Sequence, residues 1–196
     1  DASAMTGVFS TTTSRLVGKT DGTNSIKGGS GNDVIIGDAN DTTNIDGNGG
    51  NDTLTGGSDK ETINGGDGND IIDGGGGADT INGGAGKDTI TMNGTESNID
   101  AGAGDDTVTA TNLLAYGVTV KGGEGTDKLS ISADESKSDF SVVSGFETLV
   151  LAGDITIDLG DLENNTFTLV QTDGTATRAV NIDGVVSETI KFKDEA

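Results

Sequence analysis

The sequence predicts an all-β fold, a right-handed parallel β-solenoid followed by further β-rich strands. A nine-residue repeat, one apolar residue in each repeat and a glycine content too high for helices point to it. Residues 65–91 show the repeat in three consecutive units, GGDGNDIID, GGGGADTIN and GGAGKDTIT. Each unit has a glycine pair, a third glycine, an acid at the sixth place and an isoleucine at the eighth.

The repeat extends in the same register in both directions along the chain. The further units are GGSGNDVII (28–36), GNGGNDTLT (47–55), GGSDKETIN (56–64), AGAGDDTVT (101–109) and GGEGTDKLS (122–130). Residues 37–46 form a degenerate unit with one extra residue, and residues 92–100 keep only the apolar Ile99. A twelve-residue unit, 110–121, precedes the last repeat, and residues 19–27 resemble a weak first one.

Each unit divides into a turn and a short strand. The first six residues need φ values that Gly, Asn and Asp accept easily, which predicts a tight turn. The last three are β-branched with one apolar residue at an alternate position, which predicts a strand. Two units then make one flattened coil, whose core consists of the eighth-place residues Ile35, Leu54, Ile63, Ile72, Ile81, Ile90 and Val108.

The chain divides by pattern into three regions. Residues 1–27 are expected to form an N-terminal β segment and cap, residues 28–130 the repeat region, and residues 131–196 a C-terminal β-rich region. Alternating apolar runs in the last region predict strands at 147–151, 155–159, 167–170, 179–182 and 189–192.

Composition excludes several classes of function. The net charge of −22 argues against nucleic acid as a partner. The chain has no His, which excludes a Ser-His-Asp triad and a histidine-based zinc site, and we expect no enzymatic activity. No apolar window of about 18 residues is present, so no transmembrane segment is expected.

The acids in the repeat point to a bound cation. Hydrophobic residues make up 31 % of the chain and cysteine is absent, so the core is thin and no disulfide supports it. Stacked coils bring sixth-place carboxylates close to turn carbonyls, and Ca²⁺ takes six to eight such oxygens. Several Ca²⁺ ions would cancel the repulsion and join successive coils. No stretch has the ligand spacing and flanking helices of an EF-hand.

These units resemble the calcium-binding nonapeptide GGxGxDxUx of RTX proteins, over residues 28–130. The resemblance implies a parallel β-roll with calcium held by turn carbonyls and sixth-place acids. The unit with Glu61 departs from the pattern, since it has Asp59 where the third glycine belongs, and Ser97 replaces the acid in residues 92–100. Carried over by position, the acids are Asp33, Asp52, Glu61, Asp70, Asp79, Asp88, Asp106 and Asp127. The turn backbone would contribute at Gly28, Gly29, Gly31, Gly65, Gly66, Gly68, Gly74, Gly75, Gly77, Gly83, Gly84 and Gly86.

The resemblance also implies a setting. RTX proteins are typically exported by type I secretion and fold outside the cell, where calcium is plentiful. The segment GFETLVLAG (145–153) resembles the C-terminal part of Gram-negative RTX surface-layer proteins. We therefore expect a calcium-binding structural module of a secreted surface-layer protein that self-associates into a lattice at the bacterial cell surface. Contact with cell-surface polysaccharide would come from other parts of the parent protein.

Two other classes of function remain as alternatives. The chain is alternatively the calcium-dependent folding and secretion domain of a type I-secreted enzyme, toxin or adhesin. The third interpretation is an adhesin or ice-binding solenoid, suggested by the seventh-place threonines Thr53, Thr62, Thr80, Thr89 and Thr107. The β propensity of threonine on a solvent-exposed face explains the same row without a ligand.

The two-unit coil makes the two edges of the solenoid unequal. Alternate units share an edge, so one edge has an acid at every step, in Asp33, Asp52, Asp70, Asp88 and Asp106. The other edge has Glu61 and Asp79, but no acid at the sixth place of residues 37–46, where Asp41 is out of place, and Ser97 at its far end. Calcium is therefore expected to stack mainly along the first edge.

Overall fold

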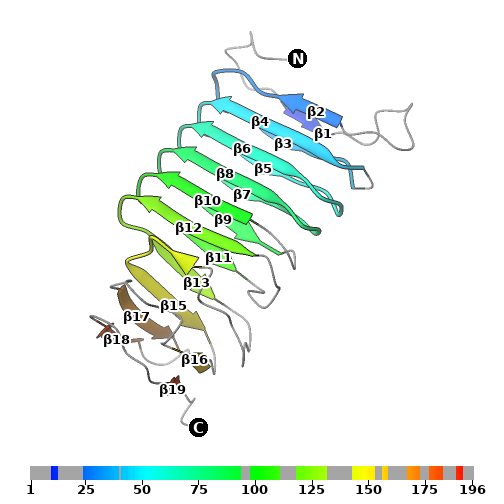
Figure 1. Cartoon of the computed structure of the whole chain (residues 1–196). Coiled ribbons are helices and arrows are strands. Elements are labelled where there is room, and N and C mark those ends of the chain that lie inside the picture. The colour runs from blue at the N-terminus through cyan, green and yellow to red at the C-terminus, as the bar shows by residue number, and fades with distance from the viewer. Residues whose placement is uncertain are drawn as a thin grey trace.

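The chain forms a stack of parallel β-coils. The computed structural model describes residues 10–12, 24–39, 41–93, 98–110, 118–131, 143–152, 156–158, 167–172, 177–182 and 189–191. All the regular secondary structure within these residues is β-strand. Successive strands alternate between two sheets that run the length of the stack (Figure 1). The predicted all-β parallel solenoid is confirmed.

The odd-numbered strands form the longer sheet. Its strands are β1 (Ser10–Thr12), β3 (Val34–Ile36), β5 (Thr53–Thr55), β7 (Ile71–Asp73), β9 (Thr89–Met92), β11 (Thr107–Ala110), β13 (Lys128–Ile131), β15 (Thr148–Ala152), β17 (Phe167–Thr172) and the even-numbered β18 (Thr177–Ile182). Pairing is parallel from β1 to β17 and antiparallel between β17 and β18.

The even-numbered strands form the second sheet, which is parallel throughout. Its strands are β2 (Asn24–Lys27), β4 (Thr43–Gly49), β6 (Thr62–Asp67), β8 (Thr80–Ala85), β10 (Asn98–Ala103), β12 (Thr119–Glu124) and β14 (Val143–Ser144). A separate antiparallel pair consists of β16 (Thr156–Asp158) and β19 (Thr189–Lys191).

The core lies between the two sheets and is one side chain deep on each side. Every predicted eighth-place residue is at most 2 % exposed. These residues stack in register, for example Ile72 between Leu54 and Ile90. The register of 18 residues between neighbouring strands in this part of either sheet confirms two units per coil.

The even-numbered strands from β4 to β12 are longer than the repeat predicts. The strand β6 includes Gly65 and Gly66, and Gly66 pairs with Gly84 of β8. The parallel ladder therefore continues through the glycines of this edge, because neighbouring coils stay close enough to pair there. On the opposite edge, residues 56–61 and 74–79 connect the strands without joining a ladder, as predicted.

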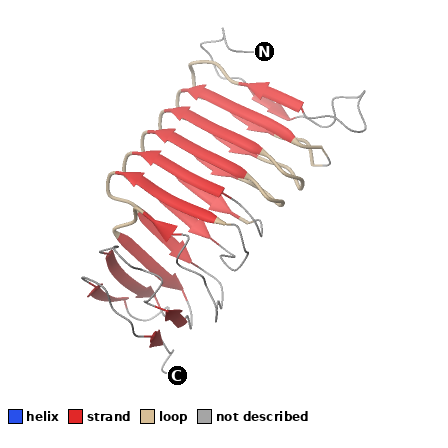
Figure 2. Ribbon diagram, in the orientation of Figure 1, coloured by secondary structure: helices blue, strands red, loops and turns tan. Residues whose placement is uncertain are grey.

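The strands predicted beyond residue 130 are present but do not all continue the coil. Figure 2 shows strands at this end of the stack, where β15 and β17 extend the odd sheet in parallel. The direction then reverses, because β18 pairs with β17 antiparallel. Parallel stacking therefore ends at β17.

Candidate metal sites in the turns

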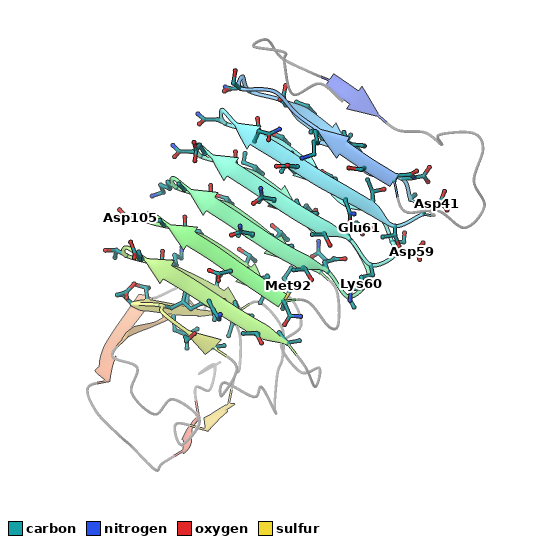
Figure 3. The ribbon with its side chains drawn as sticks, turned by 45° about the horizontal axis from the view of Figure 1, so that its top comes forward. Asp41, Asp59, Lys60, Glu61, Met92 and Asp105 are labelled. Carbon is teal, nitrogen blue, oxygen red and sulfur yellow. The ribbon has the colours of Figure 1, made fainter. Side chains whose placement is uncertain are left out.

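The predicted acids lie on two opposite edges of the stack. The first edge holds the turns that lead from even to odd strands, and its sixth-place acids are Asp33, Asp52, Asp70, Asp88, Asp106 and Asp127. The second edge holds the turns that lead from odd to even strands, with Glu61 and Asp79. Figure 3 shows Glu61, Asp59 and Lys60 at one edge and Asp105 at the other.

All eight predicted acids are buried, at 0 to 1 % exposure. A buried carboxylate is stable only with hydrogen bonds or a cation. Since the side chains on either side of each acid in the repeat are more exposed, burial is specific to the sixth place.

On the first edge, one oxygen of each carboxylate from Asp52 onward joins successive coils. The backbone N–H of Asp52 donates to Oδ1 of Asp70 at 2.7 Å, and the N–H of Asp70 donates to Oδ1 of Asp88 at 2.8 Å. The same bond links Asp33 to Asp52, Asp88 to Asp106 and Asp106 to Asp127, each at 2.8 Å. On the second edge the N–H of Glu61 donates to Asp79 at 2.9 Å. We call this series the buried carboxylate ladder.

The second carboxylate oxygen is the one that fits a cation. It is buried and has no hydrogen-bond partner at Oδ2 of Asp52, Asp70, Asp88, Asp106 and Asp127 and at Oε1 of Glu61. Leaving one buried acceptor without a partner costs about 1–3 kcal/mol, and more when it is charged. A row of such oxygens is therefore stable only where a cation or a proton neutralises it.

Backbone carbonyls face these oxygens from the neighbouring coil. A Cβ built on Gly28 would lie 2.5 Å from Oδ2 of Asp33 and 2.5 Å from the carbonyl oxygen of Gly47. The carbonyl of Gly65 and Oδ2 of Asp52 enclose the same point at Gly47. At Gly28 and Gly47 the absence of a Cβ leaves this space to the oxygens.

The side chains alone cannot complete a metal site. Within the described residues, no group of three or more His, Cys, Asp or Glu side chains could hold an ion. The carboxylates come one per coil, so most ligands of any bound ion must be turn carbonyls. This mixture of oxygen donors suits a hard divalent cation such as Ca²⁺.

Burial also raises the pKa of seven ladder acids, namely Asp52, Glu61, Asp70, Asp79, Asp88, Asp106 and Asp127. The pKa of Asp52 and Asp79 rises to about 6, and that of Glu61 and Asp88 to about 7. Loss of solvation is the main cause, and neighbouring carboxylates add to it, while the backbone N–H donors act in the opposite direction. Without a cation, these acids therefore bind protons near neutral pH.

The divergent acid Glu61 occupies the same position as the aspartates. Its Oε2 accepts the N–H of Gly57 at 3.0 Å, just as Oδ2 of Asp33 accepts the N–H of Gly29 at 2.7 Å. The longer side chain thus reaches the same turn amide although Asp59 replaces the third glycine.

The structure also places two residues in the ladder that the repeat register did not identify. Thr43 precedes the pair of Asn44 and Thr62, and its N–H donates to the carboxylate of Glu61. It is 0 % exposed, and its hydroxyl accepts the N–H of Asp38 at 3.2 Å. The extra residue in 37–46 had shifted it out of the sixth place, so the second edge begins with a neutral side chain. Asp41 lies outside this position, as expected, and Ser97 lies outside the described residues.

Glu147 extends the first edge by one coil. Its Oε2 accepts the N–H of Asp127 at 2.7 Å, so it takes the place of a sixth-place acid. A signal existed in the sequence, because GFETLVL (145–151) aligns with GTDKLSI (125–131) when Glu replaces Asp.

Comparison with known families agrees with this geometry. The RTX calcium-binding nonapeptide repeat family matches the chain in four copies, at residues 20–42, 40–71, 55–90 and 97–112. The matched segments cover the ladder from Asp33 to Asp106, whereas Asp127 and Glu147 lie beyond them. Comparison with curated proteins and with solved structures gave no match. In the described part of the chain, no helix has the length and hydropathy needed to cross a membrane.

Proposed function

We propose that this chain, whose turns carry RTX calcium-binding nonapeptide repeats, is a structural module of a secreted bacterial surface-layer protein that folds and assembles on Ca²⁺ outside the cell. The observation that carries the proposal is the row of buried carboxylate oxygens without hydrogen-bond partners. A chain with a net charge of −22 can keep such a row ionised only with cations.

The first edge would hold most of the ions. Its six aspartates and Glu147 supply one carboxylate per coil, and the carbonyls of first-place residues such as Gly47 and Gly65 face them. Glu61 and Asp79 would hold ions on the second edge, where the described acids form a shorter row. When bound, each Ca²⁺ would neutralise the carboxylates and join neighbouring coils.

A structural role fits the rest of the molecule. The described residues contain no His and form one thin stack, so the module acts through its shape and its metal-dependent order. The segment 145–153, which resembles the C-terminal part of surface-layer proteins, continues the odd sheet as β15 and brings Glu147 into the ladder. Extracellular calcium is plentiful enough to fill sites of modest affinity.

Electron microscopy of the intact parent protein tests the proposal. We expect two-dimensional arrays in millimolar Ca²⁺ and none in chelator. A parent protein that binds calcium but forms no arrays, and that carries a catalytic domain upstream, would instead make this chain a folding and secretion domain.

A further inference from the structure

The outer face of the odd sheet differs from every other surface of the stack. We call the seventh- and ninth-place side chains of β3 to β13 the odd-strand face. Residues at the eighth place point inward along these strands, so the seventh and ninth places face outward. Six of the outward positions are threonines, in three pairs: Thr53, Thr55, Thr89, Thr91, Thr107 and Thr109.

The odd-strand face has no net charge, although the chain carries −22. From β3 to β13 its charged side chains are Asp73 and Lys128, one of each sign. The even sheet carries more charged side chains on its outer face, in the ion pair of Lys27 with Asp46 and that of Lys121 with Asp100, and these charges also sum to zero. Both edges carry the turn acids. Two copies of so acidic a chain therefore repel each other less where sheet faces meet than where edges meet.

The same face exposes the large apolar side chains of the stack. Ile71 is 56 % exposed and Val34 is 38 % exposed, and both occupy the seventh place on odd strands. Among the described residues they are the large hydrophobic side chains that solvent reaches most. The threonine methyl groups beside them make a flat surface of β-branched side chains, depleted in charge, as at the centre of protein interfaces.

We propose that the odd-strand face docks on the odd-strand face of a second copy of this chain. This inference rests on the proposed function and names the surface through which the module would self-associate. A face that is flat, uncharged overall and built mainly of β-branched side chains is complementary to itself, which suits a two-fold contact. The two sheets would pack as in a β-sandwich.

The contact is small, which sets its strength. Six strands spaced about 4.8 Å apart, with three residues rising about 3.3 Å each, give roughly 300 Å² per copy. A stable pair of proteins buries about 800 Å² per partner. The contact is therefore weak in dilute solution and becomes significant at high protein density, as in a surface lattice.

Sedimentation of the 196-residue chain in Ca²⁺, over a series of rising concentrations, tests the proposal. The test variant is Thr89→Glu, which places a carboxylate on the odd-strand face of both copies. Its matched control is Thr80→Glu, which makes the same change at an exposed seventh place on the even sheet. We expect Thr89→Glu to weaken association about tenfold or more, because like charges facing each other across an interface cost several kcal/mol. Thr80→Glu should associate as the unmodified chain does.

Circular dichroism at each Ca²⁺ concentration shows whether both variants still fold. Ile71→Glu provides a second change on the same face and should weaken association in the same way. The proposal is overturned if the unmodified chain stays monomeric at every concentration, or if Thr80→Glu and Thr89→Glu have equal effects. Calcium-dependent folding with unaltered association in both face variants would reject this surface and leave the proposed function standing.

Discussion

Two adjacent glycines of one turn, Gly75 and Gly76, show how differently the repeat positions are constrained. Gly75 has φ of +80°, and a Cβ there would meet the carbonyl oxygen of Gly57. A Cβ on Gly76 would come no closer than 3.6 Å to Ser58. In this turn the second place therefore requires glycine, and the third place does not.

We predict that Gly75→Ala destabilises the calcium-bound fold by about 1–2 kcal/mol or more, because left-handed backbone and close contact both oppose a side chain. Gly76→Ala should change stability by less than about 1 kcal/mol. Urea unfolding at fixed Ca²⁺ measures both. Equal losses in the two variants would contradict the assigned backbone geometry.

A second, exposed ladder runs along the fifth places of the first edge. The N–H of Asn51 donates to Oδ1 of Asn32, and the N–H of Asn69 donates to Oδ1 of Asn51, both at 2.8 Å. The N–H of Lys87 continues the series to Asn69 at 2.7 Å. Lys87 itself offers no side-chain acceptor to the next coil, so the ladder is interrupted at its side chain.

We predict that Lys87→Asn lowers the calcium midpoint for folding relative to Lys87→Ala. Both substitutions remove the same positive charge, but only asparagine supplies an acceptor, and an exposed hydrogen bond is worth about 0.5 kcal/mol. Calcium titrations followed by circular dichroism compare the two. A midpoint for Lys87→Asn equal to or above that of Lys87→Ala would show that the fifth-place ladder adds nothing.

At the scale of the turns, the two edges should respond differently to loss of a carboxylate. Asp70 lies inside the longer row, where it accepts from Asp52 and donates to Asp88. Asp79 lies in the shorter row and accepts from Glu61. Both units keep all three glycines and an isoleucine at the eighth place, so the comparison is matched.

We predict that Asp70→Ala raises the calcium midpoint for folding more than Asp79→Ala does. Removing an interior carboxylate of the first edge affects the ion sites on both sides of it. Calcium titration of the two variants, monitored by β-sheet circular dichroism, compares their midpoints for folding. If Asp79→Ala titrates at the same or higher calcium, ions do not stack mainly along the first edge.

The turns also show which features of the fold and of the metal sites the repeat predicts. The ninefold spacing of glycine, acid and isoleucine predicted the two-unit coil and the inward row, because each strand depends on its neighbours 18 residues away. It missed Thr43, because the extra residue in 37–46 moved Thr43 from the sixth to the seventh place of its unit. It missed Glu147, since an acid with a longer side chain lies outside the family spacing but still reaches the amide of Asp127. The extension of β6 through Gly65 and Gly66 depends on contact between coils and has no local signal.

At the scale of the whole molecule, calcium should control folding. One buried aliphatic residue per nine cannot offset the conformational entropy of the chain, and the charge of −22 opposes compaction. We predict a largely unfolded chain in chelator and a β-rich one in millimolar Ca²⁺, with dissociation constants of about 10⁻⁴ to 10⁻³ M per site. Mg²⁺ should substitute poorly, because it demands a tighter octahedral geometry. A full β signal in chelator would refute this prediction.

A lower pH should partly replace calcium in stabilising the fold. The folded-state pKa values of Asp52 and Asp79 are about 6 and those of Glu61 and Asp88 about 7, above the ordinary values of 3.8 and 4.5. Between the ordinary and the raised pKa values, the folded chain therefore binds more protons than the unfolded chain. Protonation of these acids then stabilises the fold, and this stabilisation is lost as pH rises through about 6 to 7. We predict that the β signal in chelator increases as pH is lowered from about 8 to 5. A signal that falls over this range would show that the ladder acids are ionised without the metal.

The direction of the buried carboxylate ladder has a consequence for the order of assembly. Each donor amide lies one coil before its acceptor in the sequence, from Asp33 to Asp52 and onward to Glu147. A coil can satisfy its buried amide only when the coil that follows it is already in place. The fifth-place ladder runs the opposite way, but its members are exposed and water can replace those bonds. The next amide in each coil points the other way, because the N–H of Ile71 donates to the carbonyl of Asp52 in the preceding coil. Each interior coil therefore needs both of its neighbours, so the stack should form cooperatively rather than from one end.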